Sequence, residues 1–286
     1  MSTSFSESSA VHESIAVEIA ERRRGRRSER IYSGRARAVL ERSAIAFKQS
    51  AWVVILSGFL EPVLFLFSFG YGVGKLIGKI DVGNHHIVSY AQFIAPALLA
   101  TSAMNGAIYD STWNVYFKLK FDRIYHAMLA TSLGPLDVAL GEIGWALLRG
   151  LAYATGFMAI VMPLGLIHGV WALLAIPAAV LIAFGFAAMG MALTTYMKSF
   201  QQMDMINIVM LPMFLFSGSF YPITIYPEWL QVIIKVLPLW HAISLMRAIA
   251  LGVITLGTLG HLAYFIAMVV IGLFFTTRRL YALFMR

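Results

Sequence analysis

Long apolar runs that carry almost no charge constrain this chain more than any other feature. Six such runs lie at roughly 52–74, 91–110, 138–162, 172–195, 205–221 and 259–277. Each is long enough to cross the hydrocarbon core of a bilayer as a helix. Charged residues make up 13% of the chain, about half the fraction found in globular domains. The sequence therefore excludes a soluble domain and predicts an all-α integral membrane protein with six transmembrane helices.

A seventh apolar stretch, at 239–257, follows a segment with three prolines and contains His241 and Arg247. The distribution of basic residues decides how it is interpreted. If both termini are cytoplasmic, 17 Lys and Arg lie inside and four lie outside, as the positive-inside rule requires. Two termini on one side demand an even number of crossings. We therefore expect 222–257 to form a re-entrant helical pair on the outer side, before the last span.

The first fifty residues differ from the rest because they hold ten basic and six acidic side chains. Residues 1–34 read as a polar, flexible cytoplasmic arm. Residues 35–50 predict an amphipathic helix in the membrane interface, with its basic side toward lipid headgroups. The alternative is a short solvated helix whose apolar stripe arose by chance. The stripe at helical spacing consists of Ala36, Val39, Leu40, Ser43, Ala44 and Phe47.

No motif of catalysis or nucleotide binding stands out. The chain has no Cys, and its seven His show no metal-ligand spacing. The stretch GYGVGK at 70–75 lacks the first Gly and the final Ser or Thr of a phosphate loop. We therefore expect no cofactor and no ATP hydrolysis in this chain. The net charge of +8 follows the membrane rule, so we expect no nucleic acid partner.

Three charged residues inside the apolar runs are candidates for a pathway or a dimer seam. Glu61 lies mid-span before a proline, where a carboxylate requires protein, water or a partner charge. Glu142 and Arg149 are seven residues apart, on one helix face and about 10 Å apart along its axis. Asp110 and Asp204 lie at the ends of runs and read as interfacial carboxylates.

The segment at 112–137 joins the second and third spans and mixes basic with aromatic residues. Ile124, Tyr125, Met128 and Leu129 recur at helical spacing. A solvated loop does not need such a stripe, so we expect it to cover a partner, either a membrane surface or another protein.

Four stretches carry a family resemblance, and it covers about residues 48–282. They read GFLEPVLFLFSFGYGVG, YAQFIAPALLATSAMNGAIYDSTW, RIYHAMLATSLGPLDVALGEIGWALLRG and LPMFLFSGSFYPITIYPEWLQVIIKVLPLWHAISLMRAIALG. In this order they resemble the permease subunits of type-2 ABC exporters, and most closely the nodulation-factor, or lipo-oligosaccharide, export group. The arm before residue 35 has no counterpart in the family pattern.

The resemblance implies a six-span domain over 51–286 in the bacterial inner membrane, with both termini cytoplasmic. It implies a coupling helix at about 120–136 and short outer helices at about 222–257. Expected partners are a separate ABC ATPase that holds ATP and Mg²⁺, membrane lipids, and a second permease copy or a paralogue. Expected cargo is a lipid-linked saccharide, a glycolipid or a hydrophobic drug. The residues expected to dock the ATPase are Arg123, Tyr125, His126, Met128 and Leu129.

Two other classes of function are weighed against this one. An ion-coupled secondary transporter would use Glu61 or Asp204 as its ion site. An integral-membrane, lipid-modifying enzyme would use His241 or Glu142 as a base. No carboxylate lies near His241 in the sequence to orient it, and no inverted pair of broken helices is evident.

Overall fold

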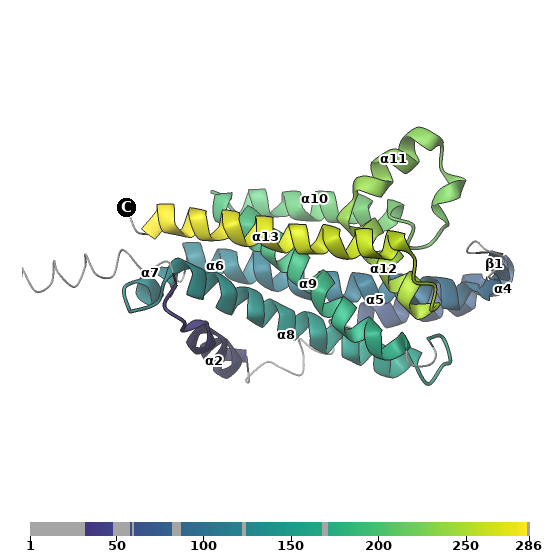
Figure 1. Ribbon diagram of the computed structural model, residues 1–286, viewed down its shortest axis with the longest axis horizontal. Helices are drawn as coiled ribbons and strands as arrows, with labels where there is room; N and C mark the ends of the chain where they lie inside the picture. Colours follow the sequence, from purple (N-terminus) through teal and green to yellow (C-terminus); the bar gives the residue numbers. More distant parts are fainter. Residues whose placement is uncertain are drawn as a thin grey trace, which may run out of the picture.

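The computed structural model describes residues 32–47, 58, 60–81, 87–121, 124–167 and 171–284. Figure 1 shows that long helices run side by side along the longest axis of the molecule. The prediction of an all-α integral membrane protein is confirmed. The elements are α2 (Ala36–Phe47), the π-helix η1 (Leu66–Val73), α4 (Gly74–Ile77), β1 (Lys79–Asp81), β2 (Ile87–Ser89), α5 (Tyr90–Tyr109), the π-helix η2 (Asp110–Asn114), α6 (Val115–Lys120), α7 (Ile124–Leu129), α8 (Pro135–Val161), α9 (Trp171–Tyr196), α10 (Gln201–Phe216), the 3₁₀ turn η3 (Ile223–Ile225), α11 (Glu228–Val236), α12 (Pro238–Ala250) and α13 (Leu256–Phe284).

Five helices of the described part are long and apolar enough to cross a membrane, and a bent pair could add a sixth. The pair is α11 and α12, which meet at 86° around Leu237. The break expected within 222–257 is therefore present. Helix α10 overlaps the apolar run at 205–221, and its 16 residues make it shorter than the five. The five helices are Leu60–Ile77, Tyr90–Lys120, Pro135–Val161, Leu173–Tyr196 and Leu256–Phe284.

Burial separates a central helix from peripheral ones. The most apolar window of the span Tyr90–Lys120 is 83% buried, whereas those of Leu60–Ile77 and Leu256–Phe284 are 17% and 22% buried. Helix α5 therefore forms the middle of the bundle, and α8, α9 and α12 pack on it. The first and last spans leave most of their apolar surface for lipid or for another protein chain.

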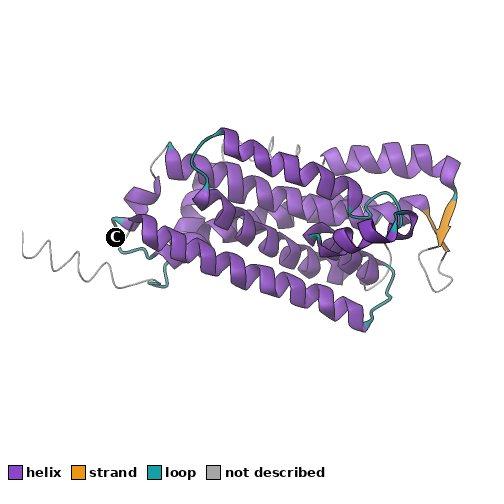
Figure 2. Cartoon of the chain, turned by 90° about the horizontal axis from the view of Figure 1, so that it is seen from above, coloured by secondary structure: helices purple, strands orange, loops and turns teal. Residues whose placement is uncertain are grey.

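Local sequence fixes where the central helix begins. The side chain of Ser89 accepts a hydrogen bond from the Gln92 N–H at 3.3 Å, and the Ser89 N–H donates to Gln92 Oε1 at 3.0 Å. This is a capping box, which satisfies two backbone groups that a helix start leaves unpaired. The antiparallel strands β1 and β2, which pair Ile80 with Val88, lead into this cap (Figure 2). The sequence analysis did not predict this hairpin.

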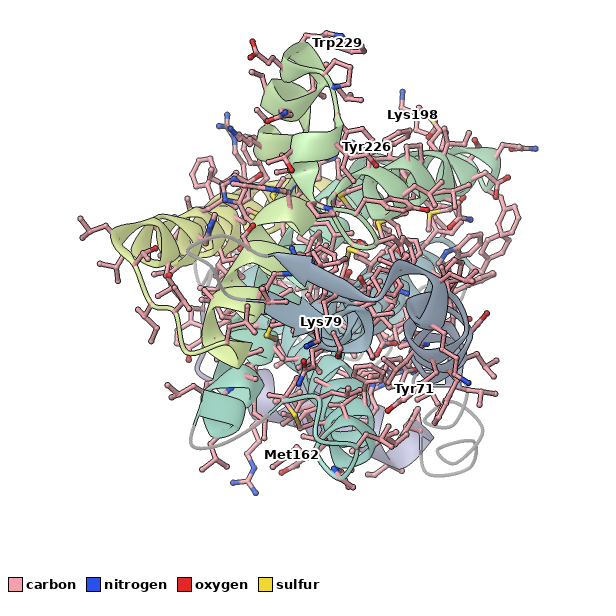
Figure 3. The ribbon with its side chains drawn as sticks, turned by 90° about the vertical axis from the view of Figure 1, so that its right-hand side faces the viewer. Tyr71, Lys79, Met162, Lys198, Tyr226 and Trp229 are labelled. Carbon is pink, nitrogen blue, oxygen red and sulfur yellow. The ribbon has the colours of Figure 1, made fainter. Side chains whose placement is uncertain are left out.

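One end of the bundle carries the hairpin and α11, and α2, α7 and the C-terminus lie at the other (Figure 1). Figure 3 views the first end and shows Trp229 at the far tip of α11, with Lys79 near the middle of the view. Arg247 of α12 holds this end together. Its guanidinium donates to the Gly218 carbonyl at 3.0 Å and lies 3.9 Å from the centre of the Phe93 ring. The bent pair is thereby fixed to α5 and to the end of α10.

Close contact between α9 and α13 gives a test of the packing. A methyl group at Gly272 of α13 would lie 2.5 Å from the backbone of Ala188, whereas one at Gly260 of the same helix would meet open space. We expect Gly272→Ala to lower the free energy of unfolding by about 1–3 kcal/mol through overpacking. Gly260→Ala is the matched control and should be neutral. Thermal unfolding of the two purified variants in detergent measures the difference, and equal unfolding temperatures would contradict the contact.

Candidate functional site

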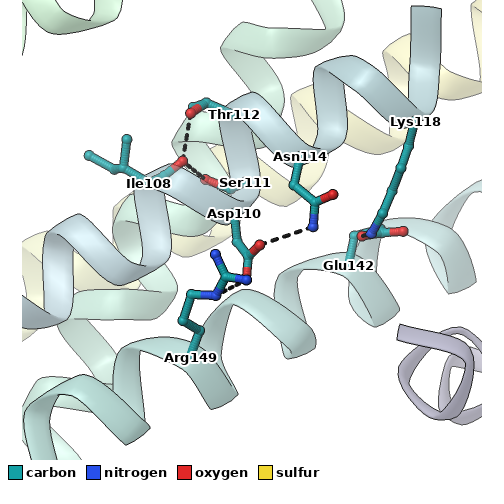
Figure 4. Close-up of polar contacts among 8 residues, drawn as sticks. All are labelled: Ile108, Asp110, Ser111, Thr112, Asn114, Lys118, Glu142 and Arg149. Carbon is teal, nitrogen blue, oxygen red and sulfur yellow. Dashed lines mark hydrogen bonds and ion pairs between the residues drawn. The ribbon is translucent and has the colours of Figure 1, made fainter. Parts of the chain in front are cut away.

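A cluster of four charged side chains is buried where α5, η2 and α6 face α8 (Figure 4). Arg149 Nε lies 2.9 Å from Asp110 Oδ2, and Lys118 Nζ lies 2.6 Å from Glu142 Oε2. Asn114 Nδ2 donates to the second Asp110 oxygen at 3.0 Å. The four formal charges cancel. The cluster therefore places two complete ion pairs inside a membrane protein, where an unpaired charge would be costly.

Helical spacing brings the partners together. Asp110, Asn114 and Lys118 recur every four residues, so they share one face of the continuous α5–η2–α6 helix. Glu142 and Arg149 are seven residues apart and share one face of the antiparallel helix α8. The two faces meet as complementary stripes. Glu142 and Arg149 therefore do not pair with each other, and each has its own partner on the opposite helix.

The π-helical turn η2 carries Asp110 into this position. A π-turn inserts one extra residue per turn and loosens the backbone hydrogen-bond ladder. The Ile108 carbonyl accepts hydrogen bonds from Thr112 Oγ1 at 2.6 Å and from Ser111 Oγ at 3.3 Å. Two short hydroxyl side chains thus support the turn locally and leave the Asp110 carboxylate free to pair with Arg149.

Two cavities lie along the spans. The first has a volume of about 340 Å³, opens beside the charge cluster, and is bounded by α2, η2, α6 and α8. The second has a volume of about 520 Å³ and is bounded by α9, α10 and α13. Its walls are almost wholly apolar and rich in methionine, a flexible side chain that adapts to varied apolar ligands. The methionines are Met189, Met197, Met205, Met210, Met213 and Met268.

Helix α7 packs its apolar stripe against the chain itself. Tyr125, Met128 and Leu129 are buried in the hydrophobic core, whereas His126 is exposed and lies edge-on against Phe284, with ring centres 4.7 Å apart. Burial raises the pKa of the Tyr125 phenol well above its ordinary value, and the nearby Glu142 carboxylate raises it further. The phenol therefore stays neutral.

This burial corrects the expectation that the stripe covers a membrane surface or another protein. The partner is the protein's own core, so Tyr125, Met128 and Leu129 cannot contact an ATPase while α7 stays seated. His126 remains accessible, as do Ala127 and Ala130. Arg123, the fifth residue expected to dock the ATPase, lies outside the described residues.

Asp137, at the start of α8, ties the beginning of α2 to the region around α7. Its Oδ2 accepts hydrogen bonds from Ser33 N at 2.7 Å, Ser33 Oγ at 2.8 Å and Gly134 N at 2.9 Å. Its Oδ1 accepts one from Arg35 N at 2.8 Å, and the Arg35 guanidinium reaches Ser132 Oγ. A single buried carboxylate therefore joins two segments about one hundred residues apart. The sequence analysis did not single it out.

The other predicted polar residues lie apart from the cluster. Glu61 is exposed on the surface of the first span, and Asp204 is exposed on α10. His241 lies 2.8 Å from His261, Nδ1 to Nδ1, and stacks on Tyr264 with ring centres 4.0 Å apart. Among the described residues no group of three or more His, Asp or Glu is placed to hold a metal ion. Within the described residues, the structure shows no ion pair between His241 and a carboxylate.

Residues 35–251 match the family model described as "ABC-2 type transporter". The chain belongs to this transporter family. The match begins at Arg35, where the backbone is bound by Asp137, and runs to the end of α12. The predicted family resemblance is confirmed. The family consists of transport components, so the multi-pass architecture and the membership agree.

Curated relatives of this ABC-2 type chain span most of its length. Nodulation protein J of Rhizobium leguminosarum bv. viciae is 33% identical over 216 residues, 75% of this chain and 82% of that protein. Nodulation protein J of Rhizobium leguminosarum bv. trifolii is 32% identical over 241 residues, 84% and 90% of the two chains. The inner membrane transport permease YadH of Escherichia coli K12 is 28% identical over 206 residues, 71% and 77% of the two chains. No solved structure matches the chain.

Sequence reasoning found half of the charge cluster in this ABC-2 type domain. It chose Glu142 and Arg149, but it treated Asp110 as an interfacial carboxylate and Lys118 as a loop cation. Asp110 is 2% exposed and Lys118 is 7% exposed, so both interpretations are wrong. The four-residue spacing from Asp110 through Asn114 to Lys118 was the available signal, because it repeats polar residues on one face of an apolar helix.

The Asp110–Arg149 pair can be tested by a double-mutant cycle. Asp110→Asn or Arg149→Met alone leaves one buried charge without its partner, and we expect each to cost about 3–5 kcal/mol of stability. The double variant should recover a large part of that loss. Chemical or thermal unfolding in detergent measures all four proteins.

The exposed pair Arg37–Glu41 of α2, at 2.7 Å, is the matched control. Removing either partner there should cost less than about 1 kcal/mol, because solvent screens both charges. Additive losses for Asp110 and Arg149 would show that their burial does not couple them.

Proposed function

We propose that this chain is the permease subunit of an ATP-driven exporter. Its membership of the ABC-2 type transporter family over residues 35–251 carries the proposal. In this proposal a separate ABC ATPase binds and hydrolyses ATP with Mg²⁺, and this chain provides the path through the membrane. The charge cluster is then the rigid joint between the spans that lead toward the ATPase.

Both termini lie on the cytoplasmic side of a bacterial inner membrane in this proposal. The C-terminus, α2 and α7 share one end of the molecule (Figure 1). Among the described residues, that end carries Arg37 and Arg42 of α2 and Arg278 and Arg279 of α13, as the positive-inside rule favours for a cytoplasmic side. Counting α10 as a short fifth span and α11–α12 as a re-entrant outer pair gives six crossings, an even number. The domain then spans residues 51–286, after an arm at 1–34 and an interfacial helix at 35–50.

The permease works as a dimer in this proposal, with itself or with a paralogue. The first span and α10 touch where the rings of Phe65 and Phe214 lie 5.6 Å apart, and both leave apolar side chains exposed that can form a surface for a second copy. Glu61 lies on that span and is exposed beside Leu60 and Leu64. A carboxylate in this position favours contact with protein or water over lipid tails. A second copy across this surface would provide both.

The class of cargo is inferred from the apolar and polar surfaces that the chain offers. The methionine-rich cavity beside α10 offers an apolar surface, and the exposed Glu61 of the first span offers a polar group. An amphiphile needs both kinds of surface. We therefore propose a lipid-linked saccharide, a glycolipid or a hydrophobic drug as cargo. Relatives named nodulation protein J agree with the predicted resemblance to the lipo-oligosaccharide export group, which supports the saccharide-bearing members of this class.

The ATPase docks, in this proposal, on the accessible face of α7, which includes His126 and Ala127. Tyr125, Met128 and Leu129 then act as positioning residues that hold α7 on the core. This assignment keeps the coupling segment predicted at about 120–136 and changes which of its side chains form the contact.

Purification from native membranes tests the assignment. The tagged chain should bring an ABC ATPase with it in a stoichiometric amount. Ala127→Asp should lower the recovered ATPase by about tenfold or more, because it places a charge and added bulk on the docking face. Mass spectrometry of the purified complexes measures the recovery.

Thr224→Asp is the control, since Thr224 is exposed near α11 at the opposite end of the molecule. It should leave the recovery unchanged. Normal recovery with Ala127→Asp would reject α7 as the docking face. A wild-type chain that purifies without any ATPase, but transports cargo when an ion gradient is imposed, would reject the whole proposal in favour of secondary transport.

A further inference from the structure

The cavity of about 340 Å³ beside the charge cluster has a wall chemistry that the proposed transport function does not use. Helix α2 forms one side, η2 and α6 form the second, and α8 forms the third. Aromatic rings make up much of the wall. They are Phe47, Tyr109, Trp113, Phe117 and Trp145. Tryptophan and tyrosine favour the level of the lipid headgroups because each combines an apolar ring with a polar group.

Several hydrogen-bond donors lining this cavity have no acceptor among the described residues. The Ser43 hydroxyl is buried without a hydrogen-bond partner. The Arg42 guanidinium makes no hydrogen bond or ion pair within the described part of the chain, and neither do the indole N–H groups of Trp113 and Trp145. A set of donors without acceptors fits a ligand that is rich in acceptor oxygens.

The charged side chains around the cavity indicate that its ligand is an anion. Lys118 and Arg149 also line the cavity, but Glu142 and Asp110 neutralise them at 2.6 and 2.9 Å. The Arg42 guanidinium also interacts electrostatically with the Glu142 carboxylate, which Lys118 already neutralises. Three cations therefore face two carboxylates, and one positive charge is left over at this site. One spare guanidinium surrounded by neutral donors suits a singly charged oxyanion such as a phosphodiester.

The arrangement of the cavity walls indicates how a bound lipid would be oriented relative to the membrane. Helix α2 rests on α8, where Val39 contacts Gly141 and Leu40 contacts Gly144. Arg149 lies about 10 Å farther along α8 than Glu142, toward the bilayer centre in the proposed orientation. The rings of Tyr109 and Phe117 in the wall are exposed. A headgroup at Arg42 therefore leaves its acyl chains an apolar exit past these two rings.

We propose that this cavity binds the phosphodiester headgroup of an anionic phospholipid from the inner leaflet. The choice of leaflet rests on the proposed orientation of the permease. The binding itself does not depend on the ATPase or on the cargo, so a failure of this inference can be told apart from a failure of the proposed function. A lipid held here joins α2 to the spans, and it would act next to the charge cluster.

Native mass spectrometry of the delipidated full-length chain, titrated with phosphatidylglycerol or phosphatidylcholine, tests the proposal. Phosphatidylglycerol should bind with a defined stoichiometry and more tightly than phosphatidylcholine. Arg42→Gln should weaken phosphatidylglycerol binding by about tenfold, through loss of a charge-assisted hydrogen bond. Trp145→Phe keeps the ring, removes the indole donor, and should weaken binding by a smaller factor.

Arg37→Gln is the matched control. It removes the same charge from the same helix, but the Arg37 side chain is 88% exposed, does not line the cavity, and pairs with Glu41. It should leave binding unchanged, and unfolding temperatures in detergent should be equal for all three variants and the parent chain. An equal loss with Arg37→Gln and Arg42→Gln would reject the cavity in favour of general surface attraction.

The source of the phosphodiester has its own test. Glycerophosphoglycerol carries the same headgroup without acyl chains, and it should compete with phosphatidylglycerol only weakly. Competition at equal concentration would replace a lipid site with a site for a soluble phosphodiester. Equal binding of phosphatidylglycerol and phosphatidylcholine to the parent chain would overturn the anionic selectivity, and with it the role given to Arg42.

Discussion

The two buried ion pairs between the α5–η2–α6 helix and α8 are the constraint on which the other contacts depend. A buried charge that loses its partner destabilises a protein by several kcal/mol, so Asp110–Arg149 and Lys118–Glu142 permit few other registers of the two helices. The position of α8 also sets the position of α2, which packs on it. Val39 of α2 contacts Gly141 of α8, and Asp137 of α8 binds the backbone that leads into α2. The position of α2 is therefore a consequence of the charge register.

The same cluster links α7 to the membrane spans. Tyr125 is fully buried, and its phenol lies close enough to the Glu142 carboxylate for the two to interact. Glu142 in turn holds Lys118 on the opposite helix. A movement of α7 away from the core would have to displace Tyr125 beside this pair. One aromatic ring and one ion pair thus form a contiguous set of contacts, along which the coupling of the proposed function would run.

The sequence predicted the structure correctly where a feature depends on the residues of one helix alone. Apolar run length located the spans, and three prolines located the break between α11 and α12. It did not predict features that depend on contacts between two segments far apart in the chain. Asp110 and Lys118 have ordinary neighbours in the sequence, and only the facing helix α8 makes them ion-pair partners. The α7 stripe showed that a partner was needed, but periodicity does not distinguish another protein from the chain's own core.

The two ends of the bundle are held by interactions of different strength. Arg149 is bound by the Asp110 carboxylate, with the Tyr109 and Phe47 rings within 6 Å of its guanidinium carbon. Arg247 has no carboxylate partner in the described part of the chain. It relies on backbone carbonyls and on the Phe93 ring. Carbonyl and ring contacts are individually weaker than a charge-paired hydrogen bond and exchange more readily. The bent pair α11–α12 is therefore the end that can rearrange at lower cost, while the charge cluster keeps the opposite end rigid.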